Sequence, residues 1–526
     1  MRSFQRPGRS PVYAEHAVIA TSHPLASEVG LSVLKAGGNA VDAVLAAVAT
    51  LCVVEPAMTG IGGDCFALYL PAGAARPIAL NGSGRAPAAA DPAWYADQGI
   101  TKIDRFTPHA VTVPGAVAAW ELLNRDHGRM PLADLLAPAI AYARDGFPIY
   151  PRVYNDWVLN EGILRADAVA GEVMLVNGAA PALGGKFRQP RLADSLAAIA
   201  REGRDGFYTG AVAEDIVARL RGLGGLHTLD DFASASAEYV DPIQGRFAGH
   251  DVFECPPNGQ GLCALMIMNI LDGYDWPSLS EVDQVHILAE AAKLGYHQRD
   301  AYIGDPAQVD VPVERLLSTA HGDRLRAMID PARAGIFHPS DFPTHPDTVY
   351  LAVVDADGNA ISFINSIFSS FGSTIMAPGS GVLLHNRGEA FNLTAGHANC
   401  IAPGKRPMHT IIPGFLMKDG KPVGPFGVMG GQYQSVGQSA FLTNLLRLGM
   451  DPQAALDAPR SFAYAGGLQM EETFSPESYV ALGQRGHLIE RMNIGIGGGQ
   501  AVIFDHATGM LIGGSDPRKD GAAIGY

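Results

Sequence analysis

The chain has 526 residues, of which 47% are hydrophobic and only 17% are charged. A chain of this composition can bury a large core, which excludes a disordered scaffold. Its formal net charge is −15, and it contains no long basic run. Both features exclude nucleic acid as a partner, because phosphate binding needs clustered Lys and Arg.

Several features that the sequence lacks bear on the cellular location of the protein and on its need for a cofactor. The five cysteines form no CxxC pair and no His-Cys metal spacing, so we expect reduced thiols in a reducing compartment. The basic N-terminus is followed by no apolar signal segment, and no run of eighteen apolar residues occurs. The glycines of NIGIGGGQ do not have the spacing of a dinucleotide loop. We therefore expect a cytoplasmic protein with no membrane partner, no cofactor and no metal.

Two helices are expected near the N-terminus. The first is predicted to begin at a Ser27 cap and to stop at a glycine pair. The second, Ala40–Val53, is apolar on nearly every side, which predicts that it is buried. The turn TGIGGDC then leads into an alternating strand, and residues 114–330 form Ala- and Leu-rich patterns that predict a helical region.

The pattern changes near residue 335. The Pro- and Asp-rich stretch IFHPSDFPTHPD, which we expect to be exposed, precedes two β-branched runs, TVYLAVVD and AISFINSIF. The ADGN segment between these runs predicts a β-hairpin. Further strands are expected at GVLLHN and within IIPGFLMKDGKPVGPFGVMGG, followed by a helix at QSAFLTNLLRLG. Helices followed by strands predict layered α/β packing.

The junction between Asp347 and Thr348 has a possible chemical role, because a linker meets a strand whose first residue carries a hydroxyl. Cleavage at this bond would give Thr348 a free α-amine. With a pKa of about 8, that amine suits a general base for the hydroxyl of the same residue. Position alone favours an ordinary β-branched residue at the start of a strand, and Thr344 is a nearby alternative nucleophile.

Several segments, in the same order along the chain, resemble the γ-glutamyltransferase family. They are GGNAVDAVLAAVATLCVVEP with TGIGGDCF, VPGAVAAWELL, CPPNGQG, DTVYLAVVDADGNAISFINSIFSSFGS, APGKRPMHTIIP, VMGG and DPRKDGAAIGY. The resemblance covers residues 16–526 and implies the αββα sandwich of the N-terminal-nucleophile hydrolases, an α+β layered fold in one intertwined body. It also implies self-cleavage into a large chain, 1–347, and a small chain, 348–526. These chains would stay together as a heterodimer, with a dimer of heterodimers as the alternative assembly.

The resemblance also assigns catalytic roles. In the family, the nucleophile lies seven residues before the Asp that ends its strand, and that Asp is Asp355 here, which selects Thr348. Ser366 matches a hydroxyl that supports the nucleophile. The backbone amides of Gly430 and Gly431 match an oxyanion hole. Without the family register, Ser366 would be an ordinary polar strand residue and the glycine pair an ordinary turn.

The substrate pocket departs from the pattern by which family transferases hold a glutamyl head. Residues that differ at the matching positions are Ser83, Phe368, Arg387, Ala390, His409 and Thr410. Ala390 stands where the family has an aspartate for the glutamyl amine, so a zwitterionic head is disfavoured. Arg387 offers a planar guanidinium to a substrate carboxylate, although a structural salt bridge is the alternative. Phe368 is expected to narrow the pocket.

This pocket resembles the acylase and amidohydrolase branch of the family. We therefore expect hydrolysis of a small acidic amide, with oxamate to oxalate and ammonia favoured, through an acyl-enzyme on Thr348. The alternatives are γ-glutamyl hydrolysis or transfer on glutathione and a cephalosporin-type acylase. A catalytically inactive homologue is disfavoured because Thr348, Ser366 and the Gly430–Gly431 pair are all present.

Overall fold

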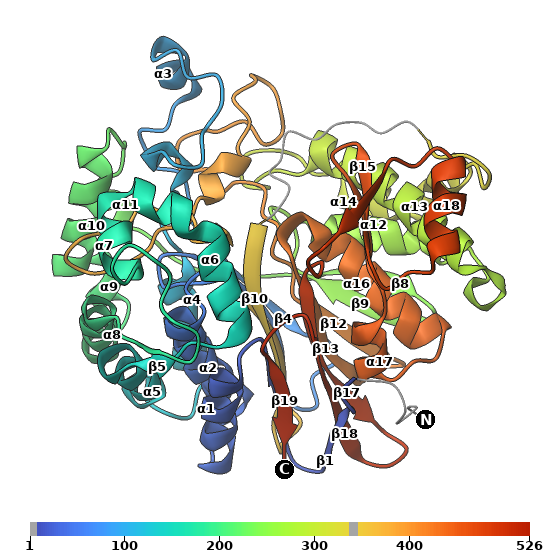
Figure 1. The fold of residues 1–526 in the computed structure, drawn as a ribbon, viewed down its shortest axis with the longest axis horizontal. Coiled ribbons are helices and arrows are strands. Elements are labelled where there is room, and N and C mark those ends of the chain that lie inside the picture. Colours follow the sequence, from blue (N-terminus) through green and yellow to red (C-terminus); the bar gives the residue numbers. More distant parts are fainter. Residues whose placement is uncertain (1–7, 336–345) are drawn as a thin grey trace.

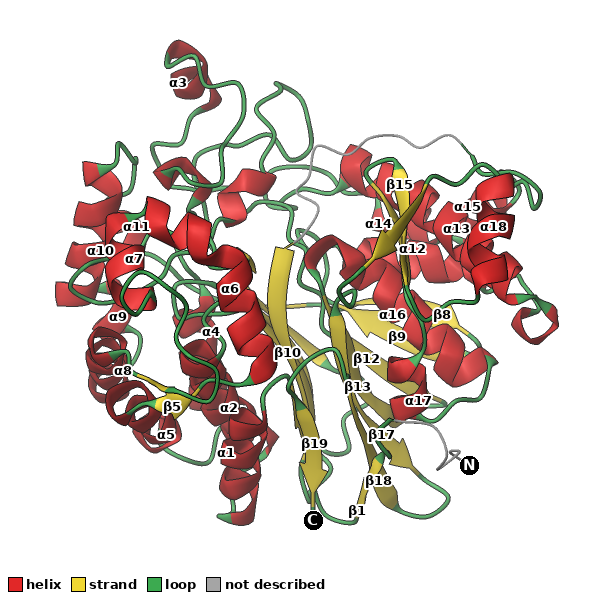
Figure 2. Ribbon diagram, in the orientation of Figure 1, coloured by secondary structure: helices red, strands yellow, loops and turns green. Residues whose placement is uncertain are grey.

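The computed structural model describes residues 8–335 and 346–526. Its elements form four layers in the order helix, sheet, sheet, helix (Figure 1). The two sheets pack face to face between the helical layers (Figure 2). This arrangement confirms the expected αββα sandwich. Thr344, the alternative nucleophile, lies outside the described residues.

Two seven-stranded antiparallel sheets form the centre. The first has the order β19, β2, β10, β11, β3, β4, β7, with bounds Ala522–Gly525, Val18–Thr21, Pro346–Val354, Ala360–Ser369, Asp64–Leu70, Ile78–Gly82 and Glu238–Val240. The second has the order β1, β18, β17, β13, β12, β9, β8, with bounds Val12–Ala14, Met510–Ser515, Gly498–Asp505, Lys421–Met429, Gly414–Lys418, His250–Glu254 and Ile243–Phe247.

Helices cover the outer face of each sheet (Figure 1). On the side of the first sheet lie α1 Pro24–Lys35, α2 Ala40–Val54, α4 Ala116–His127, α5 Leu132–Asp145, α6 Pro151–Ala166, α8 Pro190–Glu202 and α10 Gly210–Gly222. On the side of the second lie α12 Gly261–Leu271, α13 Glu281–Tyr302, α15 Thr319–Arg326, α16 Gln434–Leu442, α17 Pro452–Asp457 and α18 Pro476–Gln484. Shorter elements are α3 Pro92–Asp97, α7 Ala168–Met174, α9 Asp205–Tyr208, α11 Leu229–Ala233, α14 Val313–Leu317, β5 Phe147–Pro148, β6 Lys186–Phe187, β14 Ser461–Tyr464, β15 Gly467–Glu471 and β16 Ile489–Met492.

The core is divided by the first sheet, and strand β3 shows how. Its residues are buried on both faces. Cys65, Ala67 and Tyr69 pack among the helices, whereas Phe66 and Leu68 pack between the two sheets. The alternation expected for this strand is therefore real, but it separates two apolar environments rather than core from solvent.

The two N-terminal helices form, with one change at a boundary. α1 begins at Pro24, because the ring of His23 accepts a hydrogen bond from Leu25 N at 3.2 Å and caps the helix. The predicted cap at Ser27 is wrong: that hydroxyl lies inside the helix and donates to the carbonyl of Ala522 at 2.7 Å. α2 is buried along its whole length, as predicted, and ends one residue later than expected.

Three other expectations also need correction. The middle region is mainly helical, but the short strands β5 to β9 interrupt it. Of these, β7 is an edge strand of the first sheet, and β8 and β9 are the last two strands of the second. GVLLHN forms only isolated bridges, Leu384 to Gly62 and Leu383 to Met376, rather than a strand. The hairpin of β10 and β11 is confirmed. The helix expected after β13 starts earlier, at Gln434, and continues as a π-helical turn, Thr443–Arg447.

The five cysteines are free thiols, as expected. None of the helices in residues 8–335 and 346–526 combines the length and the apolarity that a membrane span requires.

We predict that Asn39→Ala lowers the free energy of unfolding by about 0.5–2 kcal/mol. Asn39 and Asp42 form a reciprocal capping box at the start of α2, and the Asn39 amide also donates to His127 O at 2.7 Å. Urea denaturation followed by circular dichroism measures the change. Ser32→Ala is the matched control, since Ser32 is exposed on α1 and its hydroxyl donates to Glu28 Oε1 at 2.9 Å. Equal midpoints for the two variants would contradict the role of the cap.

Candidate active site

Thr348 lies in the third position of β10, and only 1% of its surface is exposed. The pairing of β10 with β11 shifts register between Asp347 and Val349, so that Ser366 and Ile367 both stand opposite Thr348. Such a bulge re-aims side chains and is common beside active sites. Here it accompanies a contact of 3.0 Å between Thr348 Oγ1 and Ser366 Oγ, in which either hydroxyl can donate.

Ser366 connects the threonine to a buried arginine. Its Oγ accepts hydrogen bonds from Phe368 N at 2.9 Å and from Arg387 Nη2 at 3.3 Å. Arg387 Nη1 donates to Thr410 Oγ1 at 2.8 Å, and the guanidinium lies 4.1 Å above the ring of Phe368. Phe368 has a φ of 77°, a conformation that costs a bulky residue about 1–3 kcal/mol. The packing beside the nucleophile holds this strained backbone in place.

Asp64, the first residue of β3, extends this network through its contacts with Arg387 and two histidines. Its Oδ1 accepts from the backbone N–H of Gly84 at 2.9 Å and of Gly115 at 3.2 Å. Its Oδ2 lies 3.0 Å from His409 Nε2 and 3.2 Å from His385 Nδ1, the latter outside hydrogen-bond geometry. Arg387 Nε lies 3.9 Å from the same oxygen. The four side chains are fully buried.

The charges of this group follow from burial and from its neighbours. Burial raises the pKa of Asp64, but its interactions with His385 and His409 outweigh burial and hold that pKa well below its usual range. Burial and the charge of Arg387 lower the pKa of His409 to about 3. The neutral ring donates from Nε2 to Asp64 and accepts at Nδ1 from Ile411 N at 3.4 Å. Burial lowers the pKa of Arg387 to about 9, against the attraction of Asp64, so the guanidinium stays charged at neutral pH.

Gly430 and Gly431 form the turn at the end of β13. Their φ values of 117° and 53° are both in the region that favours glycine, and a Cβ on Gly430 would lie 3.0 Å from Gly497 Cα. Gly431 begins the short 3-10 helix η4, Gly431–Tyr433, which packs against β10. The turn therefore lies beside the strand that carries Thr348. Its role as an oxyanion hole stays a prediction.

A cleft of about 500 Å³ reaches Gly430 and Ser370. It runs between α6 and residues 492–497, and the charged residues that line it are Arg105, Arg152, Asp156 and Lys519. Ser83 is not part of it. That residue lines a separate cavity of about 140 Å³, and its hydroxyl accepts from Asn258 Nδ2 at 3.1 Å.

The structure thus gathers six of the predicted site residues in one network, whereas Gly430 and Gly431 form a turn beside β10 and Ser83 lines a separate cavity. Those in the network around the nucleophile are Thr348, Ser366, Phe368, Arg387, His409 and Thr410. The sequence interpretation assigned no role to Asp64 or His385, although they lie in the quoted segments TGIGGDCF and GVLLHN. A carboxylate at the start of an otherwise apolar strand was the signal that could have identified Asp64.

A buried threonine hydroxyl at the start of a central strand, in two antiparallel sheets between helical layers, defines the class of an N-terminal-nucleophile amide hydrolase. Residues 26–526 match the family described as Gamma-glutamyltranspeptidase, and the chain belongs to this family. The resemblance seen in the sequence is confirmed.

Individual relatives cover nearly the whole chain. The Glutathione hydrolase-like YwrD proenzyme of Bacillus subtilis is 38% identical, over 97% of this chain and 98% of that protein. The Oxamate amidohydrolase proenzyme of Klebsiella pneumoniae subsp. pneumoniae is 36% identical, over 97% and 98%. The crystal structure of cephalosporin acylase from Bacillus halodurans has a TM-score of 0.93 at 40% identity and covers 100% of this chain and 99% of that one.

We predict that Asp64→Asn lowers the free energy of unfolding by about 3–5 kcal/mol, because it leaves the buried Arg387 without a counter-charge. Chemical denaturation measures the loss. Asp241→Asn is the control, since it breaks an ion pair with Arg76 that is exposed on both sides, and such pairs contribute little. If the Asp64 variant unfolds at the same denaturant concentration as the control, Asp64 does not organise the site.

Proposed function

We propose that the chain cleaves itself between Asp347 and Thr348 and then hydrolyses a small acidic amide. The products of cleavage are a large chain, 1–347, and a small chain, 348–526, which stay associated. Curated relatives described as proenzymes support the cleavage. Oxamate, which would give oxalate and ammonia, is the favoured substrate.

The chemistry follows from the atoms around Thr348. After cleavage, its α-amine accepts the Oγ1 proton as Oγ1 attacks the amide carbonyl. The N–H groups of Gly430 and Gly431 stabilise the developing oxyanion. The protonated amine gives its proton to the departing nitrogen, and ammonia leaves an ester on Thr348. Water then hydrolyses this ester. The 3.0 Å contact with Ser366 orients the hydroxyl throughout.

One observation carries the choice of an acidic substrate: a charged guanidinium lies one side chain away from the nucleophile. Arg387 Nη2 is 3.3 Å from Ser366 Oγ, which is 3.0 Å from Thr348 Oγ1. In oxamate the carboxylate is bonded directly to the scissile carbonyl, so it would stand next to this cation when the carbonyl meets Oγ1. The guanidinium hydrogens now bond two neutral hydroxyls, of Ser366 and Thr410. A carboxylate is a stronger acceptor than either.

Charged groups also line the cleft beside Gly430. Three are cations, Arg105, Arg152 and Lys519, and Asp156 pairs with Arg152 at 2.7 Å. An anionic substrate that enters the cleft would meet these cations.

A second candidate is an acylase with a larger leaving group. The volume of the cleft, about 500 Å³, exceeds what ammonia needs, and the cleft reaches Gly430. The structural similarity to a cephalosporin acylase agrees with this use. A γ-glutamyl substrate is less favoured, because Ala390 offers no carboxylate to its amine.

We predict that Thr348→Ala remains a single uncut and inactive chain, whereas Thr348→Ser is cut more slowly because a hydroxyl survives. A denaturing gel shows the cut, and mass spectrometry of the wild-type small chain gives its first residue, expected to be Thr348. Thr344→Ala is the matched control and should be cut normally. A small chain that begins at Thr344 would refute the assignment.

We predict that Arg387→Ala raises KM for a small acidic amide by the equivalent of about 2–3 kcal/mol, the upper range for a charged hydrogen bond. Arg387→Lys should restore only part of the loss, since an ammonium cannot reproduce a two-pronged grip. An assay of ammonia release from oxamate and glutamine, and of cysteinylglycine release from glutathione, measures both effects. Arg85→Ala is the control, because Arg85 lines the separate cavity beside Ser83 and pairs with Glu238 and Asp305.

The same assay decides between substrates. Far faster turnover of γ-glutamyl compounds by the wild type would return the chain to glutathione chemistry. An unchanged KM in a correctly cut Arg387→Ala variant would make Arg387 a structural residue only.

A further inference from the structure

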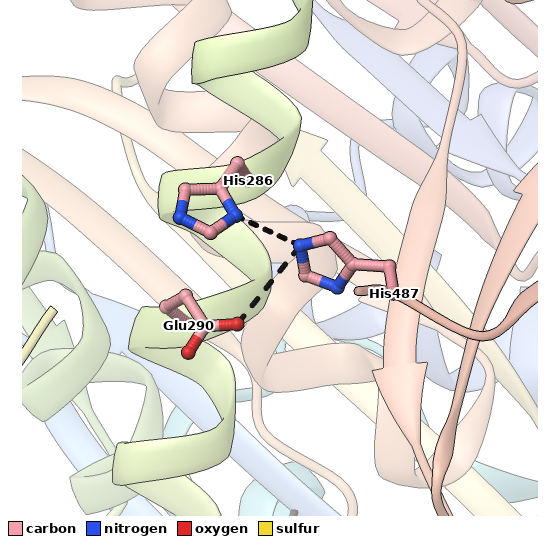
Figure 3. Close-up of side chains that lie close together, drawn as sticks. All are labelled: His286, Glu290 and His487. Carbon is pink, nitrogen blue, oxygen red and sulfur yellow. Dashed lines mark hydrogen bonds and ion pairs between the residues drawn. The ribbon is translucent and has the colours of Figure 1, made fainter. Parts of the chain in front are cut away.

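Two histidines and a glutamate form a second buried group, outside the network around Thr348 (Figure 3). His286 and Glu290 lie one turn apart on α13, and His487 lies between α18 and β16. All three are buried, and one ligand atom from each lies within 4.8 Å of the others. His286 Nδ1 is 2.8 Å from His487 Nε2, and His487 Nε2 is 4.0 Å from Glu290 Oε1.

Backbone groups orient both residues of α13 toward a common centre. His286 Nε2 lies 2.8 Å from the carbonyl oxygen of Asp330. A carbonyl can only accept, so Nε2 carries the hydrogen and the lone pair of Nδ1 faces His487. Glu290 Oε2 accepts from Gly335 N at 2.9 Å, which leaves Oε1 on the side of His487. Metal-binding histidines and carboxylates are held by second partners in this way.

We propose that His286 Nδ1, His487 Nε2 and Glu290 Oε1 bind a zinc ion. Two imidazoles and one carboxylate are a donor set that zinc accepts. Zinc–nitrogen bonds of about 2.0–2.1 Å in tetrahedral geometry separate two nitrogens by about 3.4 Å, so the rings need only a small shift. The hydrogen on His487 Nε2 moves to Nδ1 of the same ring, and no proton is lost from either imidazole.

Lys293 competes with the metal for Glu290 Oε1. Its Nζ donates to Glu290 Oε1 at 2.7 Å and also to Gly335 O at 3.2 Å. Zinc and this ammonium cannot both approach Oε1 closely, because like charges repel. When zinc binds, Lys293 keeps the Gly335 carbonyl as its partner. Removing its charge should therefore strengthen zinc binding.

The location of the site gives zinc a structural role. His286 and Glu290 belong to the large chain and His487 to the small chain, so a bound ion would join the two after cleavage; this consequence rests on the proposed cleavage. Residues 330–335, which hold both ligands of α13, lead toward the junction at Thr348. Ala334 N also donates to Arg485 O, beside His487, at 2.7 Å.

Zinc titration of the purified, chelator-treated protein against a coloured competing chelator tests the proposal. The wild type should bind a single equivalent of Zn²⁺, and Mg²⁺ should not compete, since it prefers oxygen ligands. Loss of a partner that only orients a ligand weakens metal binding by about 10–100-fold, and loss of a ligand should weaken it at least as much. Glu290→Gln and His487→Gln, which keep the size and polarity of the side chains, should show this loss.

Two further variants keep the test decisive. Lys293→Gln retains all three ligands and should bind zinc more tightly than the wild type. His506→Gln removes an exposed histidine after β17 and should bind as the wild type does. Thr348→Ala, the uncut chain, should also bind, so a failure of cleavage and a failure of zinc binding are distinguishable. The proposal is overturned if neither the wild type nor Lys293→Gln takes up zinc. It is also overturned if Glu290→Gln and His487→Gln take up zinc as the wild type does.

Discussion

The carboxylate of Asp64 is the charge around which the region of the nucleophile is arranged. It is fully buried, and it draws N–H groups from Gly84 and Gly115 to one oxygen and His409 to the other, with His385 close by. An unpaired charge in this position would cost several kcal/mol. The segments that carry these partners must therefore meet at the start of β3, next to the pair of strands β10 and β11.

The position of Arg387 follows from this constraint. Its guanidinium faces Asp64 with one nitrogen, hydrogen-bonds Ser366 and Thr410 with the other two, and lies over the ring of Phe368. One buried cation thus connects the charge of Asp64 to the hydroxyls beside the nucleophile. Because Ser366 also meets Thr348 through the bulge in β11, a change in the buried charge reaches the nucleophile through only two hydrogen bonds. Charge balance and the orientation of the nucleophile are therefore coupled in this site.

Much of the fold was predictable wherever the signal is local. The apolar residues of α2 and the turn between β10 and β11 lie within short segments, and these elements form as expected. The errors have a different origin. The cap of α1 is His23 rather than Ser27, because the hydroxyl of Ser27 finds a partner in β19, 495 residues away. The edge strands β7 and β8 have weak apolar alternation and are defined by the strands beside them.

The sequence by itself determined the αββα class, through its family resemblance, and the hydroxyl, guanidinium and glycine pair available for chemistry. It also placed Thr348 where a linker meets a strand. Only the tertiary structure decided which charges pair. His409, which hydrogen-bonds Asp64, is 345 residues away from it, and the two histidines of the second buried group are 201 residues apart. Local patterns carry no information about such pairs, because burial and chain crossing, rather than neighbouring residues, bring their atoms together and set their charges.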